Sequence, residues 1–91
     1  MAYRVVIKKR AEKELAKLDS KAQAILVHWM LNNLEACDDP RSIPGGKALA
    51  GIESGWRWRV GMYRILAVID DTTITIEVFR IGHRRDVYRS Y

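Results

Sequence analysis

The sequence predicts an α+β domain in which two helices cover one face of a small, mostly antiparallel sheet. Three observations lead to this prediction: an alternating strand-like segment opens the chain, two helix-like segments follow it, and three strand-like segments fill the second half. The 91 residues suffice for one modest core, and no change of composition or linker-like stretch divides them. We therefore expect a single domain over residues 1–91.

The first strand and the first helix are predicted from a change of period near the start of the chain. Tyr3, Val5 and Ile7 alternate with Arg4 and Lys8 over a β-branched stretch, which is typical of a half-buried strand. From Lys9 onward, apolar side chains recur at positions i, i+4 and i+7 among charged residues, namely Ala11, Leu15 and Leu18. This spacing predicts a short amphipathic helix. We expect it to form a helical hairpin with a second helix that follows it in the sequence.

A second helix is predicted over Lys21–Glu35. Ser20 and Gln23 have the spacing of a capping box, in which a hydroxyl and a side-chain amide satisfy free N–H groups at a helix start. The helix is apolar on more than one face, and we expect Leu26 and Trp29 to face the sheet. Packing on the first helix is expected of Val27, Met30 and Leu31. The alternative is that part of this apolar surface receives a partner.

Proline and glycine interrupt the chain before its second half. Asp38–Gly46 holds two prolines and two glycines and is expected to be an exposed loop, after which Lys47–Gly51 returns to regular structure. Trp56–Val60 then alternates aromatic and basic side chains. A strand here places two tryptophans on one face and two arginines on the other.

Two further strands, over Tyr63–Ile69 and Thr73–Ile81, complete a three-stranded antiparallel meander. A turn at Gly61 and the polar turn Asp70–Thr72 join the three strands. The tail Gly82–Tyr91 is polar and basic, and we expect at most a short helical turn there. The helices thus cover one face of the sheet and leave the other for function.

Charge indicates the kind of partner. Sixteen lysines and arginines against eleven acidic residues give a net charge of +5, and the pI is near 9.7. Such an excess attracts a polyanion, with a nucleic acid as the leading candidate. Surplus charge that only keeps the protein in solution is the alternative.

The apolar runs and the cysteine count indicate where the protein is located and whether it binds a metal ion or a cofactor. No apolar run approaches the roughly 20 residues that span a bilayer, and the opening segment lacks the apolar stretch and cleavage site of a signal peptide. We expect a cytoplasmic protein without membrane association. Cys37 is the only cysteine, which excludes an intrachain disulfide, and no Cys/His spacing suggests a zinc site. We expect neither a metal ion nor a cofactor.

Arginine dominates the C-terminal third, at positions Arg57, Arg59, Arg64, Arg80, Arg84, Arg85 and Arg89. The planar guanidinium stays protonated and binds phosphate oxygens through paired hydrogen bonds, which favours RNA binding over general solvation. His83, beside two of these arginines, is either a proton acceptor or a loop histidine without a role. Tyr88 either contacts a base or ribose, or caps the sheet edge.

Several segments together resemble the RelE/ParE toxin superfamily, and the similarity covers nearly the whole chain. They are Arg10–Leu18, Lys47–Gly51, Trp56–Val60, Tyr63–Leu66 and, as the most specific, Ile81–Tyr88. The resemblance implies a RelE-like fold and the toxin of a type II toxin-antitoxin system. It further implies a metal-independent endoribonuclease that inhibits translation by cleaving mRNA in the ribosomal A site. In this reaction the 2′-hydroxyl of the RNA attacks the adjacent phosphate, so that the RNA supplies its own nucleophile.

The resemblance assigns catalytic roles residue by residue. Arg59 and Arg64 hold the phosphate, Arg84 stabilises the transition state or protonates the leaving oxygen, and Tyr88 orients the nucleotide. The general base stays open: His83 is the favoured candidate, a movement of Lys47 into the site is the second, and charge stabilisation with weak base catalysis is the third. Further RNA contacts are expected from Lys47, Arg57, Arg85 and Arg89.

The second-strand positions depart from the family's pattern. Well-known ribosome-dependent members have lysines there, one of them proposed as the general base, whereas this chain has Arg57 and Arg59. Because guanidinium is not deprotonated in proteins, Arg59 is a poor base.

The resemblance also implies partners. These are a RelB-like antitoxin from the same operon, mRNA and the 70S ribosome, with DNA contacted only through the toxin-antitoxin complex. Two other functions stay open: a ParE-like inhibitor of DNA gyrase without ribonuclease activity, and an RNA-binding module without catalysis.

Overall fold

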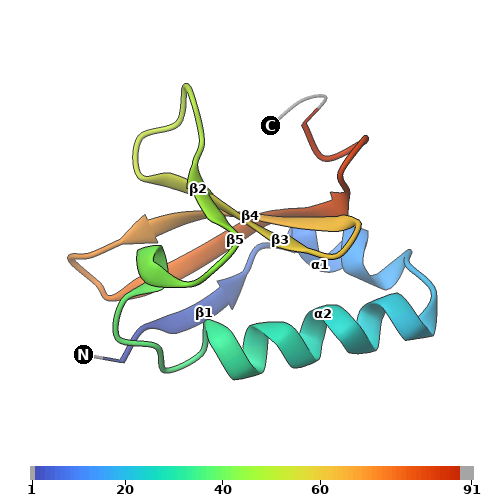
Figure 1. Ribbon diagram of the computed structural model, residues 1–91, viewed down its shortest axis with the longest axis horizontal. Helices are drawn as coiled ribbons and strands as arrows, with labels where there is room; N and C mark the ends of the chain where they lie inside the picture. Colours follow the sequence, from blue (N-terminus) through green and yellow to red (C-terminus); the bar gives the residue numbers. More distant parts are fainter. Residues whose placement is uncertain (1, 89–91) are drawn as a thin grey trace.

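The protein, as a computed structural model that describes residues 2–88, has the predicted α+β architecture (Figure 1). In chain order its elements are β1 (Arg4–Ile7), α1 (Lys9–Ala16), α2 (Ser20–Asn33), the 3-10 turn η1 (Pro40–Ser42), β2 (Gly46–Ala48), β3 (Gly55–Val60), β4 (Tyr63–Asp70) and β5 (Thr75–His83). In Figure 1, α2 runs below the sheet, whereas the β2–β3 loop and the C-terminal turn rise on the other side. Within the described residues, no helix is long and apolar enough to cross a membrane.

All five strands belong to one sheet with the order β1-β5-β4-β3-β2. The predicted meander of β3, β4 and β5 is confirmed, and β1 joins it in parallel at β5. The strand β2 was not predicted as such, because it is only three residues long and lies between two turn-rich segments. It pairs antiparallel with β3, with Gly46 opposite Trp58 and Ala48 opposite Trp56.

The main core lies between the sheet and the helices. Strand alternation sends Trp58, Ile65 and Val78 toward the helices, where all three are fully buried. The buried side chains of α2 are Ala22, Leu26 and Met30. Trp29 packs against this core with its ring centroid 6.4 Å from that of Trp58, so the predicted orientation of this face of α2 is confirmed.

The predicted packing of Val27 and Leu31 on the first helix is wrong. Their side chains are 39% and 62% exposed, and only Met30 of the three predicted residues is buried. The reason is that α1 has only eight residues and packs chiefly against β5. One side of α2 is therefore left uncovered.

The predicted capping box at the start of α2 is also wrong. Asp19 is the cap, and its carboxylate accepts a hydrogen bond from the N–H of Ala22 at 2.8 Å. Gln23 instead donates its side-chain amide to the carbonyls of Ala16 and Leu18, at 3.1 and 2.8 Å, and so ties α2 to the end of α1. Aspartate and serine are both strong N-caps. The spacing in the sequence therefore favoured Ser20, one residue after the cap that the structure uses.

The turn between β4 and β5 is longer than predicted, because β5 begins at Thr75 rather than Thr73. The Asp70 carboxylate accepts hydrogen bonds from the N–H groups of Thr72 and Thr73, at 3.0 and 3.1 Å. These bonds, that from Thr73 foremost, lower the pKa of Asp70. The chain then re-enters the sheet through Ile74, whose φ of 53° lies in the left-handed region.

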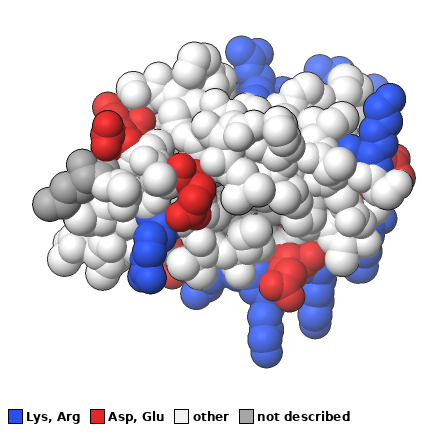
Figure 2. All heavy atoms as spheres, turned by 90° about the horizontal axis from the view of Figure 1, so that it is seen from below, with Lys and Arg blue, Asp and Glu red and all other residues white. Residues whose placement is uncertain are grey.

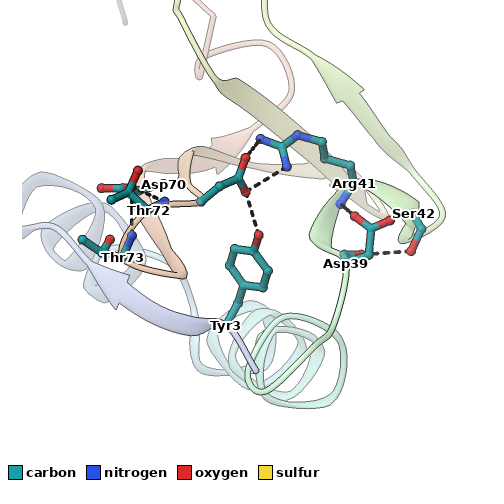
Figure 3. A network of polar contacts seen from close by, with 8 residues as sticks. Tyr3, Asp39, Arg41, Ser42, Asp70, Thr72 and Thr73 are labelled. Atoms are coloured by element: carbon teal, nitrogen blue, oxygen red, sulfur yellow. Dashed lines mark hydrogen bonds and ion pairs between the residues drawn. The ribbon is translucent and has the colours of Figure 1, made fainter. Parts of the chain in front are cut away.

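Polar contacts join this turn to Tyr3 and Arg41, which are far from it in the sequence (Figure 3), and the turn contributes Asp71 to them. The Asp71 carboxylate accepts hydrogen bonds from the Tyr3 hydroxyl at 2.6 Å and from the Arg41 guanidinium at 3.1 and 3.2 Å. The guanidinium of Arg41 and the hydroxyl of Tyr3 lower the pKa of Asp71. The network fastens η1 and the residue before β1 to the β4–β5 turn.

Replacing Asp71 by asparagine is expected to make stability less dependent on acid pH. A carboxyl group with a lowered pKa in the folded state stabilises above its unfolded pKa, and this contribution is lost as the pH falls through the lowered value. Urea unfolding of the wild type and of Asp71→Asn should differ at pH 7, and the difference should shrink toward pH 2. The exposed Glu53→Gln change is the control. A difference that is the same at both pH values contradicts this account of Asp71.

Candidate nucleic-acid interface

Four basic side chains of β2, β3 and β4 share the sheet face that points away from the helices. Trp56 and Trp58 face the helices, so alternation along β3 sends Arg57 and Arg59 to the opposite, open face. Directly paired residues lie on the same face of a sheet. Lys47 of β2 pairs with Arg57, and Arg64 of β4 pairs with Arg59, so both also lie on the open face.

Arg59 and Arg64 form the tightest of these pairs. The N–H of Arg59 donates to the carbonyl of Gly45 on the β2 side at 3.1 Å, so Arg59 makes no ladder hydrogen bond toward β4. Residues paired in this way approach to about 4.5 Å between Cα atoms. Like charges directly opposite each other destabilise a sheet, and an anion bound between them removes this cost.

Backbone carbonyls hold two of the guanidinium groups in position. Arg64 donates through Nη1 to the carbonyls of Gly61 and Tyr63, at 3.2 and 3.0 Å. Arg57 donates through Nη1 to the carbonyl of Gly45 at 2.8 Å. Each guanidinium keeps further N–H groups for a ligand.

The C-terminal turn brings further residues to the same end of this face. The N–H of Arg84 donates to the carbonyl of Met62 in the β3–β4 turn at 2.9 Å, so the backbone of Arg84 lies beside the turn that precedes Arg64. Val87 is fully buried against Leu49 and Leu66 in a second, small core on the open face. The exposed residues of the turn include Arg84, Arg85 and Tyr88. The predicted contact Arg89 lies outside the described residues.

The cations at the β2–β4 end of this face have no acidic partners among residues 2–88, whereas Lys8, at the β1 edge, pairs with Glu77 at 3.5 Å. No ion pair within that part of the chain involves the six residues Lys47, Arg57, Arg59, Arg64, Arg84 and Arg85. The arrangement therefore concentrates unneutralised positive charge at one end of the open face. Such a surface binds phosphate groups.

The structure does not bring His83 to this face. His83 follows Ile81 at a spacing of two in β5, and Ile81 is buried in the core on the helix side. The imidazole lies edge-on to Tyr63, with ring centroids 6.1 Å apart, and its Nδ1 accepts a hydrogen bond from the N–H of Arg85 at 3.2 Å. The expectation that His83 is the general base thus finds no support in the geometry, because strand alternation turns it away from Arg59 and Arg64.

Arg80 is separate from the basic surface as well. Its side chain is 8% exposed and donates through Nε to the Glu14 carboxylate of α1 at 2.8 Å, while Glu14 also accepts from the N–H of Ile81 at 3.1 Å. In the sequence, Arg80 stands among the other arginines of the C-terminal third. Glu14 has the i, i+4 spacing of an ion pair with Arg10 within α1, and this spacing gave no sign that its shorter contact is with Arg80 in β5.

We expect Arg80→Met to destabilise the fold by about 3 kcal/mol, because it leaves the Glu14 carboxylate partly buried without its main partner. Urea unfolding measures this loss. The double variant Arg80→Met, Glu14→Gln should recover part of the stability. If Arg80→Met unfolds like the wild type, the Glu14 ion pair does not fasten α1 to the sheet.

The fold and the open basic face are together those of a small toxin of the RelE/ParE kind. Residues 5–88 match the family described as the ParE toxin of type II toxin-antitoxin system, parDE. The protein belongs to this family of toxins.

Two relatives from Mycobacterium tuberculosis are similar over nearly their full lengths. Toxin RelG is 34% identical, over 98% of this chain and 99% of its own. The solved toxin-antitoxin complex RelBE2 contains a chain that is 28% identical with a TM-score of 0.77, covering 92% of this chain and 100% of that one. The archaeal RelE-RelB complex from Pyrococcus horikoshii contains one that is 25% identical with a TM-score of 0.73, covering 99% and 100%.

Proposed function

We propose that this toxin is an endoribonuclease that cleaves mRNA in the A site of the 70S ribosome, in the cytoplasm, and thereby inhibits translation. The observation that supports the proposal best is the pair Arg59 and Arg64, with the Arg84 backbone beside the β3–β4 turn at the same end of the open face. Two guanidinium groups on a directly opposed pair, with a third arginine whose backbone lies beside the adjoining turn, match the charge of a phosphodiester whose oxygens gain negative charge during cleavage.

The proposed reaction needs no nucleophile from the protein. The ribose 2′-oxygen attacks the adjacent phosphorus in line, the bond from phosphorus to the 5′-oxygen breaks, and the proton leaves the 2′-hydroxyl as another reaches the 5′-oxygen. The products are a 2′,3′-cyclic phosphate and a 5′-hydroxyl. Arg59 and Arg64 hold the phosphoryl oxygens, Arg84 stabilises the charge that develops, and Tyr88, 40% exposed in the C-terminal turn, orients the nucleotide.

The geometry favours two of the three candidate routes for the 2′-hydroxyl proton. Lys47 is exposed on the open face and is paired directly with Arg57. Arg57 lies two residues before Arg59 in β3. Either Lys47 accepts the proton, or solvent accepts it while the arginines lower the barrier by charge stabilisation. We expect His83→Gln to retain cleavage within a few-fold of the wild-type rate.

Removing Arg64 or Arg84 is expected to abolish most of the cleavage. Primer extension on a defined mRNA in a purified translation system should show cuts with the wild type that fall about 100- to 1,000-fold in rate with Arg64→Ala or Arg84→Ala. Lys21→Ala, which removes an exposed cation from α2, is the matched control and should cut normally. Omitting the ribosomes should also remove the cuts. Unaltered cleavage by both arginine variants would exclude this site.

The alternative is gyrase inhibition, which the resemblance to ParE-like members leaves open, and the matched family is described as the ParE toxin. Intact mRNA after incubation with wild-type protein and ribosomes, combined with loss of gyrase supercoiling activity, would establish it. Binding of RNA without cleavage in the same assay would instead indicate an RNA-binding module.

We further propose that a RelB-like antitoxin binds the side of α2 that the fold leaves uncovered. A groove of about 170 Å³ between α2 and the edge strand β1 is lined by Val5, Ile7, Val27, Met30, Leu31 and Glu35. Figure 2 views the side that carries α2, and much of its centre is uncharged. The relatives' solved structures are toxin-antitoxin complexes, which supports the antitoxin as the occupant. In this proposal the toxin contacts DNA only through that complex.

Leu31→Asp is expected to weaken binding of the co-expressed antitoxin at least tenfold, because it replaces apolar contact area with a charge in the groove. Isothermal titration measures the affinity. Ile25→Asp, on the same helix but outside the groove lining, is the matched control, and mRNA cleavage by both variants should be unchanged. Equal weakening by the two variants would contradict a contact confined to the groove.

A further inference from the structure

Gly82 of β5 is the glycine whose presence the fold explains least. Of the six glycines, three have a left-handed φ, and at two others an added Cβ would lie 2.5 or 2.9 Å from another side chain. Gly82 has neither constraint: its φ lies outside the left-handed region, and an added Cβ would meet only the Cβ of Val87, at an ordinary packing distance of 3.9 Å. Alanine is more stable than glycine inside a strand. The glycine at position 82 therefore has a reason other than the packing of residues 2–88.

Gly82 lies on the open face, in one row with the two arginines proposed to hold the phosphate. It pairs with Arg64 across β4 and β5, and Arg64 pairs with Arg59 across β3 and β4, so all three share a face. The Arg64 guanidinium donates to the carbonyls of Gly61 and Tyr63, which draws it toward the β3–β4 turn. No atom of Arg64 lies within 4 Å of the position that a Cβ on Gly82 would take. The backbone of Gly82 is thus bare and only half-buried next to the phosphate site.

Met62 gives this bare backbone an apolar border. The N–H of Arg84 donates to the carbonyl of Met62 at 2.9 Å. This bond continues the β4–β5 ladder one step beyond the pair Tyr63 and His83, so strand alternation extends to Met62. Tyr63 packs against the helix-side core, which puts Met62 and Arg64 on the open face. Met62 is 50% exposed, and a thioether side chain adapts to the planar rings that it contacts.

The three surfaces follow the order of the groups in a nucleotide. The arginine pair suits a phosphate, and Gly82 offers bare backbone one strand further on, about 4.8 Å away. Met62 is the diagonal neighbour of Gly82, and such neighbours lie about 7–8 Å apart, within reach of a long side chain. A glycine inside a strand often marks a place where a ligand approaches the backbone closely. A nucleotide with its phosphate between the arginines can therefore place its sugar on Gly82 and its base against Met62.

We propose that Gly82 and Met62 form a nucleoside subsite, in which the sugar next to the scissile phosphate packs on the Gly82 backbone and its base contacts the Met62 thioether. The inference rests on the proposed function for the phosphate between Arg59 and Arg64. It adds that shape selects the nucleotide as well as charge, because the missing side chain at position 82 admits the sugar ring. Contact with a thioether tolerates any base, so this subsite positions the nucleotide and does not read its sequence.

Two probes of the purified toxin separate this subsite from the phosphate site. NMR titration gives Kd for 2′-O-methyl adenylyl-adenosine, an uncleavable dinucleotide with one phosphate, and for inorganic phosphate. Gly82→Ala should weaken dinucleotide binding about tenfold, because its methyl group occupies the space of the sugar. Phosphate binding should keep the wild-type Kd. The urea midpoint of Gly82→Ala should equal or exceed that of the wild type, because the added Cβ fits beside Val87.

Met62 has its own set of variants. Met62→Ala should weaken dinucleotide binding about threefold without affecting phosphate binding, and Met62→Leu, which keeps the apolar bulk, should restore the wild-type Kd. Ile25→Ala on α2 is the matched control, because Ile25 is 48% exposed. This control should bind both probes as the wild type does.

Three results would overturn the inference. The first is a wild-type Kd for the dinucleotide that is no lower than the Kd for inorganic phosphate, and the second is an unchanged dinucleotide Kd in Gly82→Ala. The third is a lowered urea midpoint of Gly82→Ala with equal loss of both probes, which would make Gly82 a requirement of the fold. Because these measurements need no turnover, a toxin that binds the dinucleotide in this way but cuts no mRNA would refute the proposed function and leave the inference intact.

Discussion

The register of β3 against β4 is the constraint on which the rest of the protein depends. Trp58 and Ile65 are directly paired and fully buried on the helix side of the sheet. A slip of one residue would exchange the faces of the whole strand and expose the tryptophan, so burial fixes the pairing. The same register sets Arg59 opposite Arg64 on the other face. The core and the basic surface are therefore two results of one strand alignment.

The two sides of the sheet serve different needs. On the helix side, apolar packing is completed by α2 except where Val27 and Leu31 stay exposed. On the open side, a small second core around Val87 fastens the C-terminal turn, which brings the Arg84 backbone to the β3–β4 turn. The cations of β2, β3, β4 and the C-terminal turn have no acidic partners within residues 2–88, and this costs stability in the free protein. The proposed binding of an anionic ligand would offset this cost.

Apolar periodicity predicted the helices and strands that bury one face, and alternation along β3 predicted that Arg57 and Arg59 point away from the core. The sequence could not predict the features that depend on contacts between distant residues. The short strand β2 exists only because β3 offers it an edge, and the role of Gln23 depends on how α1 ends. For His83, the neighbouring arginines in the sequence suggested a place in the basic site, but its position in β5, opposite Tyr63, turns the imidazole away from Arg59 and Arg64.

The most direct test of the account is a double-mutant cycle on Arg59 and Arg64, built from the single glutamine variants and the double variant and measured by urea unfolding at low salt. Without RNA, we expect an unfavourable coupling of about 0.2–1 kcal/mol between the two side chains. With saturating 2′-O-methyl RNA, the coupling should become favourable, because both arginines then hold one phosphate. A coupling near zero under both conditions would contradict the claim that this pair is the phosphate-binding centre.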